Sequence, residues 1–212
     1  MSLPFWFEVF VMALNSGFGA AVARSRNTPI FGTLLAGLLV GLGGGMVRDM
    51  LLGQEPIAIS NPVFIPACIA SGIVGALLFS RIVAMPKPLL LLQGLVLGTL
   101  VTIGAQKALA LDAPVISAIA LGVVTATFGG LVADVMTGNR AAIASQAHWL
   151  ASALTCGSIA FVIVSLTLGF YPAVIVSVGV SAAFRYVSVA RNWPSPSWPG
   201  RSGNKARNQD GN

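Results

Sequence analysis

An arginine and an aspartate, Arg48 and Asp49, stand inside a strongly apolar stretch, directly after three consecutive glycines at positions 43–45. Each charge costs roughly 2.5 to 3.5 kcal/mol near the centre of a bilayer on insertion scales, so charged residues there mark a functional interior by default. A carboxylate raises the local concentration of cations, and backbone carbonyls freed at a helix break can replace part of an ion's hydration shell. These residue types in this order therefore mark a candidate functional interior within a membrane.

The same pattern returns later in the chain. Asp134 follows a glycine pair at positions 129 and 130, at the interval that separates Asp49 from its own glycines. These two aspartates are among only six acidic residues in the chain, so their agreement is informative. The candidate functional residues of the two motifs are Gly43, Gly44, Gly45, Arg48, Asp49, Gly129, Gly130 and Asp134.

Simpler interpretations compete with a functional break at the glycines. Glycine costs about 0.8 to 1.0 kcal/mol relative to alanine in a helix interior, which weakens the second span locally. Gly41 and Gly45 could instead let another helix pack closely, and Arg48 could extend its side chain to the membrane interface. Adjacent residues on a helix do not face one another, so an ion pair between Arg48 and Asp49 is not assumed. The recurrence of glycines with an aspartate favours a break beside an aqueous path.

Composition places these residues in a membrane protein. Of the 212 residues, 56% are hydrophobic and 8% are charged, which is far from the balance of a soluble domain. The apolar runs are continuous rather than alternating, which predicts helices instead of a β-barrel. A helix needs about 20 apolar residues to cross a hydrocarbon core of roughly 30 Å. We predict an all-α fold with seven transmembrane helices, near Pro4–Ala23, Pro29–Gly53, Pro62–Arg81, Pro88–Lys107, Pro114–Gly138, His148–Leu168 and Pro172–Arg191.

The distribution of lysine and arginine predicts the orientation, because cytoplasmic loops carry the positive excess. The first, third and fifth connections and the tail are basic, whereas the second, fourth and sixth are acidic or neutral. The N-terminus should then lie outside and the C-terminus in the cytoplasm. The net charge of +6 reflects this topology and a polar tail, predicted to be disordered. It does not indicate nucleic-acid binding, because the basic residues are not interleaved with aromatic ones.

An internal repeat organises the chain. Sliding the sequence along itself until Pro29 falls on Pro114 also aligns Gly53 with Gly138, the two aspartates and many other glycines, without a gap. Each copy holds three spans, and because three is odd, the second copy must enter the membrane from the opposite side, as in transporters and related pores. We therefore divide the chain into a first repeat (1–83), a second, inverted repeat (86–168), a seventh transmembrane helix (172–191) and a basic cytoplasmic tail (192–212).

In this topology the charges gather at the two membrane faces. The charged pair of the second span lies toward the outer side, together with a predicted outer vestibule of Glu55, Lys107 and Asp112. Asp134 and Arg140 lie toward the inner side. This distribution predicts two polar vestibules that flank a narrow, apolar or glycine-lined centre.

The motif GLGGGMVRDMLLG at 41–53, the weaker GGLVADVMTG at 129–138 and the three-plus-three repeat resemble the prokaryotic trimeric intracellular cation (TRIC) channel family, whose members are also labelled glycine transporters. The resemblance covers about residues 5–190. It implies a homotrimer in contact with lipid in a prokaryotic inner membrane, with one pathway per protomer for monovalent cations such as potassium. The kinked second and fifth helices would line that pathway.

Two positions depart from the family pattern: Ala133 stands where a second arginine often occurs, and Thr28 and Pro29 replace an acidic residue. The alternative function is a secondary transporter of a small amino acid such as glycine, or of another small zwitterion or anion, with Arg48 holding a carboxylate. An enzyme is not expected, because His148 is the only histidine and no acid, base or metal constellation accompanies it. No cofactor or metal site is predicted.

Overall fold

The computed structural model describes residues 3–78, 86–138 and 150–191, and within these ranges every regular element is a helix. In chain order the elements are α1 (Phe5–Ser25), α2 (Ile30–Leu38), the π-helical turn η1 (Leu39–Gly43), α3 (Gly44–Leu51), α4 (Ile57–Ser60), α5 (Phe64–Leu77), α7 (Pro86–Ala110), α8 (Val115–Met136), α9 (Leu150–Thr167) and α10 (Phe170–Ala190).

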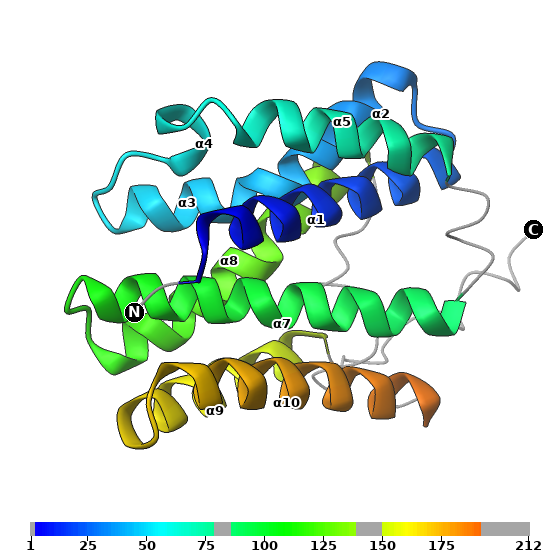
Figure 1. Ribbon diagram of the computed structural model, residues 1–212. Coiled ribbons are helices and arrows are strands. Elements are labelled where there is room, and N and C mark those ends of the chain that lie inside the picture. Colours follow the sequence, from blue (N-terminus) through cyan, green and yellow to red (C-terminus); the bar gives the residue numbers. More distant parts are fainter. Residues whose placement is uncertain (1–2, 79–85, 139–149, 192–212) are drawn as a thin grey trace, which may run out of the picture.

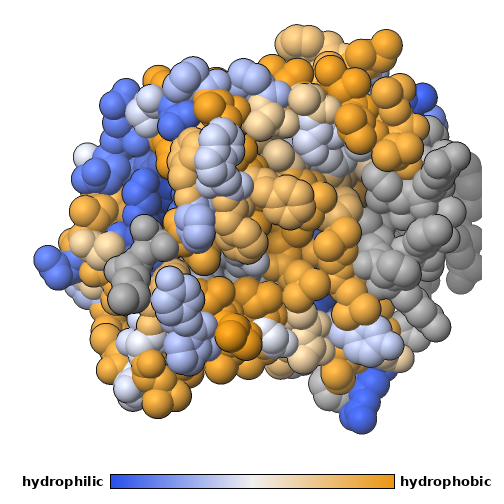
Figure 2. Space-filling view, in the orientation of Figure 1, coloured by the Kyte–Doolittle hydropathy of each residue, from blue (hydrophilic) through white to orange (hydrophobic). Residues whose placement is uncertain are grey.

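Six helical spans in the described ranges are long and apolar enough to cross a membrane, and α5 is a shorter apolar helix. The helices α2, η1 and α3 together make one of the six, Ile30–Leu51. The prediction of an all-α integral membrane protein is therefore confirmed. Figure 2 agrees, because hydrophobic side chains cover the middle of the visible face while the most hydrophilic ones gather toward its edges.

The third span differs from its predicted bounds of Pro62–Arg81. The helix α5 begins at Phe64 and ends at Leu77, so its 14 residues give only about 21 Å of helix. Residues 79–81, the predicted end of this span, and His148, the predicted start of the sixth, lie outside the described residues. The other spans agree with their predicted bounds to within a few residues.

The helices form two groups (Figure 1). The helices α1 and α5 pack together on one side, and α7, α9 and α10 pack together on the other. The span α2–η1–α3 packs on α1 and crosses α8, which it contacts along η1 and α3. The C-terminal ends of α3 and α7 lie at the left in Figure 1, whereas α1 ends at the right.

Equivalent positions of the two halves have the same backbone conformation. Asn27 and Asp112, which follow α1 and α7, have φ angles of 58° and 55°. Gly53 and Gly138, which follow α3 and α8, have φ angles of 65° and 71°. Asparagine, aspartate and glycine are the residues that enter this left-handed region most readily, and glycine there commonly ends a helix. Both pairs have the spacing of the repeat predicted from the sequence.

Helix packing follows the same spacing. A Cβ atom on Gly37 would lie 2.9 Å from the carbonyl oxygen of Ser16, and one on Gly122 would lie 2.9 Å from that of Val101. In each half, a glycine of the second span thus allows the backbone of the first span to approach. The two contact pairs occupy equivalent positions in the two copies of the sequence repeat.

The seventh span lies against the second half only. Gly169, with φ 93°, makes the turn between α9 and α10. The helix α10 packs mainly on α9 and α7.

Candidate ion pathway

The two spans that carry the glycine motifs touch at those glycines. A Cβ atom on Gly43 would lie 3.2 Å from the Cα of Gly129. A Cβ on Gly44 would collide with the carbonyl of Thr125, and one on Gly129 with the carbonyl of Leu39. Because these neighbours are backbone atoms, they cannot move aside as a flexible side chain can. The glycines therefore allow a close crossing of the spans, which is the packing role that small residues have in membrane bundles.

The predicted breaks in the two spans have different outcomes. In the second span the helix widens into η1 over Leu39–Gly43 and then resumes as α3, so the irregular turn ends where the glycine triplet begins. In the fifth span, α8 continues as an α-helix through Gly129 and Gly130. The prediction of a glycine-broken fifth helix is therefore wrong. Glycine lowers helix propensity by only about 1 kcal/mol, and packing on the neighbouring helices is enough to keep α8 regular.

A buried amide supports η1. A π-helical turn disturbs the usual pattern of backbone hydrogen bonds, and such turns occur frequently at functional sites. Asn15 of α1 donates from Nδ2 to the carbonyl oxygen of Val40 at 2.7 Å, and its side chain is only 4% exposed. One such hydrogen bond stabilises a fold by about 1 kcal/mol. The sequence patterns did not identify Asn15, although a lone amide within an apolar span was a usable signal.

Asp49 is the centre of a charge cluster at the end of α3. Its Oδ1 accepts hydrogen bonds from Nε of Arg48 at 2.7 Å and from Nζ of Lys107 in α7 at 2.9 Å. Its Oδ2 accepts one from the backbone N–H of Ile57, at the start of α4, at 3.0 Å. One carboxylate thus joins α3, α4 and α7.

The structure answers two questions about Arg48 that the sequence left open. The side chain is 1% exposed, so it does not extend to the membrane interface. It also forms an ion pair with Asp49, which is 0% exposed, because the side chain bends so that Nε rather than the tip reaches the neighbouring carboxylate. The Nη1 atom of Arg48 has no hydrogen-bond partner among the described residues. An unsatisfied buried donor costs about 1 to 3 kcal/mol, so the unpaired Nη1 of Arg48 lowers the free energy of unfolding.

Further charged residues lie at the same end of the molecule. The partly buried carboxyl of Glu8, in α1, is within electrostatic range of Arg48 and Lys107, so two acids and two bases gather there. Glu55 and Asp112 are exposed in the connections after α3 and α7, and their carboxylates form no ion pair within the described part of the chain. Of the predicted outer vestibule, only Lys107 joins the charge cluster directly.

The second aspartate is paired at the opposite end of the bundle. Oδ1 of Asp134 accepts a hydrogen bond from Nη1 of Arg26 at 2.7 Å, and the two side chains are 14% and 38% exposed. Arg26 directly follows α1, much as Lys107 lies in the last turn of α7. Each aspartate is therefore bound by a cation from the end of the first helix of the other half. Arg140, which the sequence placed on this side, lies outside the described residues.

Ala133 takes the place in the second half that Arg48 has in the first. It is 5% exposed and packs with Ala23 and Ala36 in a small apolar cluster. An arginine at this position would have to displace the methyl groups of α1 and α2. Close packing around Ala133 therefore leaves no room for a second arginine. As a result, the two ends of the crossing carry different charge clusters.

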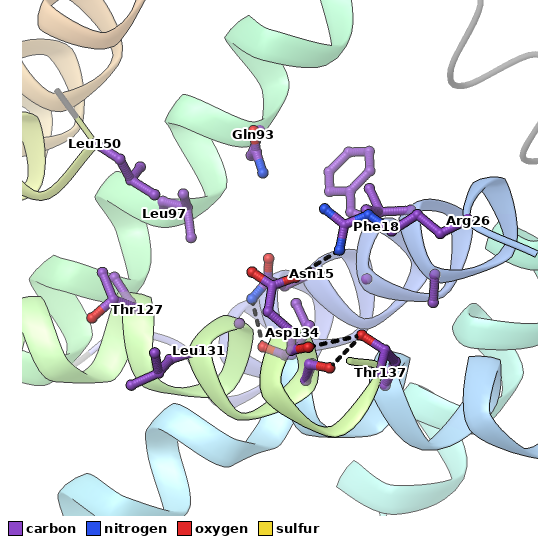
Figure 3. Close-up of a pocket in the computed structure, with 18 residues that line it drawn as sticks. Asn15, Phe18, Arg26, Gln93, Leu97, Thr127, Leu131, Asp134, Thr137 and Leu150 are labelled. Atoms are coloured by element: carbon purple, nitrogen blue, oxygen red, sulfur yellow. Dashed lines mark hydrogen bonds and ion pairs between the residues drawn. The ribbon is translucent and has the colours of Figure 1, made fainter. Parts of the chain in front are cut away.

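A cavity of about 170 Å³ lies beside Asp134. In Figure 3, Asn15 and Arg26 lie next to Asp134, and Gln93 is directed toward them from α7. Gly130 also lines the cavity, and a Cβ there would meet no atom within 4 Å. The apolar part of the lining includes Leu97, Leu131 and Leu150. A water molecule takes about 30 Å³ in the liquid, so the cavity has room for an ion with several waters.

A second cavity, of about 380 Å³, lies under the α1–α2 connection and the end of α8. Arg26, Ala36 and Thr137 line both cavities. Arg26 thus stands at the boundary between the two spaces, and its partner Asp134 lines the first of them. The sequence had assigned Arg26 only to the orientation of the chain, because its partner is 108 residues away.

A family comparison covers both halves of the chain. The family model described as "Glycine transporter" matches residues 5–80 and 90–166. The UPF0126 inner membrane protein YadS of Escherichia coli is 28% identical over 136 residues, which are 63% of this chain and 66% of that protein. The alignment thus spans just under two thirds of the relative's length.

Solved structures match over nearly the whole fold. A structure described under "Structural basis for conductance through TRIC cation channels" has a TM-score of 0.81 at 24% identity, covering 92% of this chain and 98% of that one. The TRIC trimeric intracellular cation channel orthologue from Rhodobacter sphaeroides has a TM-score of 0.79 at 27% identity, covering 87% and 96%. The resemblance drawn from the glycine motifs is therefore confirmed at the level of the fold.

Proposed function

The chain belongs to the glycine transporter family, and from this premise we propose that it is a passive membrane channel for monovalent cations, with potassium as the permeant ion. Its similar solved structures are described as cation channels rather than as enzymes, in line with the lack of a catalytic constellation in the sequence. The observation that carries the proposal is the pair of aspartates, Asp49 and Asp134, at opposite ends of one glycine-rich crossing.

The proposed pathway lies within each protomer, between α2–η1–α3 and α8. It leads from the cluster at Asp49, past the contact of Gly43 with Gly129, to the cavity beside Asp134. Carboxylates at the two ends would raise the local cation concentration. The cavity offers polar atoms from Asn15 to a partly dehydrated ion. No dedicated filter sequence is present, so we expect modest discrimination between potassium and sodium.

This arrangement is that of a closed channel. The backbones of Gly43 and Gly129 are in contact, and Lys107 and Arg26 each occupy an aspartate. Conduction therefore requires α3 and α8 to separate, and the Lys107 and Arg26 side chains to withdraw from the two aspartates. Because each cation comes from the other half of the fold, a relative movement of the halves would release both ends.

The two halves are proposed to be inverted repeats, 1–83 and 86–168, followed by the seventh helix 172–191. Matched helix ends and matched glycine contacts at equivalent positions of the two copies support this division. In the proposed orientation the N-terminus lies outside and the C-terminus lies in the cytoplasm, with the chain in an inner membrane, as the name of the Escherichia coli relative states for that protein.

We also propose a homotrimer in contact with lipid. Large apolar side chains are exposed on the single chain, among them Phe31 at 79% and Ile116 at 81%. Such a surface needs lipid or another protomer to cover it. The relative from Rhodobacter sphaeroides is described as trimeric. Light scattering of the protein in detergent would measure the number of chains per particle.

The second candidate is a secondary transporter of a small amino acid such as glycine. Two observations favour it: the family description, and the buried Nη1 of Arg48, which has no partner among the described residues and could receive a carboxylate. A transporter would expose its site to one side at a time and would saturate with substrate. A channel would pass many ions in each opening.

Purified protein in planar bilayers and in liposomes separates the two candidates. Unitary currents in symmetric potassium chloride, with a reversal potential that follows the potassium gradient, are the expected result. Saturable uptake of labelled glycine without unitary currents would overturn the channel. Arg48→Lys is an informative variant, because it keeps the charge but loses the bidentate grip on a carboxylate, so it should impair a transporter more than a channel.

A further inference from the structure

The cavity beside Asp134 contains a polar atom that the fold does not use. Asn15 is 4% exposed and its Nδ2 is committed to Val40, which fixes the orientation of the amide. Its Oδ1 accepts no hydrogen bond from the described residues, and Asn15 lines the cavity. In Figure 3 the Asn15 side chain lies next to Asp134. An amide oxygen and a carboxylate thus face the same small space, as ligands that monovalent and other hard cations prefer.

The Asp134 carboxylate of this site is already paired with the guanidinium of Arg26. Nη1 of Arg26 binds Oδ1 of Asp134 at 2.7 Å, from a position that also borders the second cavity. Arg26 is 38% exposed and follows the end of α1, so its long side chain has open space into which it can withdraw. Ion pairs with a solvent-exposed partner are weak. A dissolved cation can therefore compete with this guanidinium.

We propose that Asn15 and Asp134 form a binding site for a single monovalent cation, and that the Arg26 guanidinium is a tethered competitor that occupies it in the closed state. The assignment rests on the proposed channel function for its physiological meaning, but the binding itself does not depend on conduction. When a permeant cation replaces Arg26 on Asp134, the Arg26 side chain moves into the second cavity and the boundary between the two cavities opens. Cation concentration on this side of the protein would then favour the conducting state.

The test compares Arg26→Gln with Arg24→Gln. Both variants remove one positive charge near the end of α1, but Arg24 donates to the backbone carbonyl of Ala76 and does not bind Asp134. The first readout is the melting temperature of detergent-purified protein, as potassium chloride replaces N-methyl-D-glucamine chloride at constant ionic strength. Because ligands stabilise the state that they bind, the midpoint of the rise in melting temperature reports the affinity of the site for potassium.

We expect the potassium midpoint of Arg26→Gln to be about fivefold lower than that of the wild type, since the variant lacks the Arg26 guanidinium. Arg24→Gln should keep the wild-type midpoint. Adding Asp134→Asn to Arg26→Gln, or Asn15→Ala to it, should abolish or weaken the response. Equal midpoints for Arg26→Gln and Arg24→Gln would overturn the inference. If Arg26→Gln does not fold, Arg26→Lys serves, because its single ammonium competes less well than a guanidinium and should also lower the midpoint.

A second readout separates this inference from the channel proposal. In planar bilayers, open probability at low potassium should be higher for Arg26→Gln than for the wild type and Arg24→Gln. If the wild type conducts and the open probability is the same in the wild type, Arg26→Gln and Arg24→Gln, the inference is overturned but the channel proposal stands. A wild type without currents would sink the channel, while the melting midpoints would still decide whether the cation site exists.

Discussion

Nζ of Lys107 lies 2.9 Å from Oδ1 of Asp49, across 58 residues of sequence. This bond ties the last turn of α7, in one half of the fold, to the end of α3 in the other. Arg26 and Asp134 make the reverse connection at the opposite end of the bundle. In the proposed closed channel, one ion pair therefore joins the two halves at each end, with a glycine contact between the ends, and each component can be changed separately.

Asp49→Asn should destabilise the protein. The substitution leaves the buried Arg48 and the partly buried Lys107 with Glu8 as the remaining nearby acid. Removing one partner of a buried ion pair costs about 3 to 5 kcal/mol, and because asparagine keeps one acceptor we expect about 3 kcal/mol. Thermal unfolding in detergent would show the loss as a lower melting temperature, and bilayer recordings would show reduced potassium conductance.

Asp112→Asn is the matched control for that change. Asp112 is exposed at the same end of the molecule, and asparagine tolerates its φ of 55°. Its melting temperature and conductance should remain near those of the wild type. A similar fall in both variants would mean that charge at this end, rather than the cluster around Asp49, stabilises the fold.

Gly44→Ala tests the crossing of the two central spans. Its Cβ would meet the backbone carbonyl of Thr125, so α3 and α8 would have to move apart. Overpacking of this kind typically costs 1 to 3 kcal/mol, so we expect a loss of about 2 kcal/mol. Gly130→Ala is the control, because nothing lies within 4 Å of its Cβ and alanine favours a helix by up to about 1 kcal/mol. Equal melting temperatures for the two variants would argue against a tight crossing.

The elements of the fold were predictable where the signal is local. Apolar run length marked the spans. The recurring glycines favoured a break, whereas the structure shows that they allow backbones to approach. The change to a π-helical turn over Leu39–Gly43 was not predictable, because it depends on Asn15, which supports the turn from another helix. Likewise, glycine content predicted a break in α8 that packing prevents.

The candidate site was predictable only in part. The two aspartates were found because they recur at the same spacing, but Arg26 and Asn15 have no counterpart in the repeat that marks them. Their roles depend on contacts with residues 108 and 25 positions away. Arg48 was recognised, yet its pairing with Asp49 was not assumed, because helix geometry alone does not describe how a long side chain can bend.

Lys107→Gln should ease opening with little effect on stability. Lys107 is 32% exposed, so losing its ion pair should cost less than about 1 kcal/mol. Asp49 keeps Arg48 and the Ile57 N–H as partners. We expect a higher open probability in planar bilayers than for the wild type, whereas Lys107→Arg, which keeps the charge, should stay close to it. Unchanged gating in Lys107→Gln would remove this lysine from the closing mechanism.

Arg48→Met tests the single arginine that the second half lacks. Methionine has a similar length and flexibility and removes a buried donor, Nη1, that has no partner in the described structure. Replacing part of a buried ionic group with an apolar side chain is often close to neutral in stability when the remaining carboxylate stays paired, as Asp49 does with Lys107. The charge of the cluster would fall by one, which should attract cations to this end of the pathway.

The expected result for Arg48→Met is a larger unitary potassium current at low salt, with rectification, because only one end of the pathway changes its charge. The difference should shrink at high salt as screening increases. Arg48→Lys is the control that keeps the charge. Currents of wild-type size and symmetry in Arg48→Met would place Arg48 outside the ion path, as a structural partner that holds Asp49 at the end of α3.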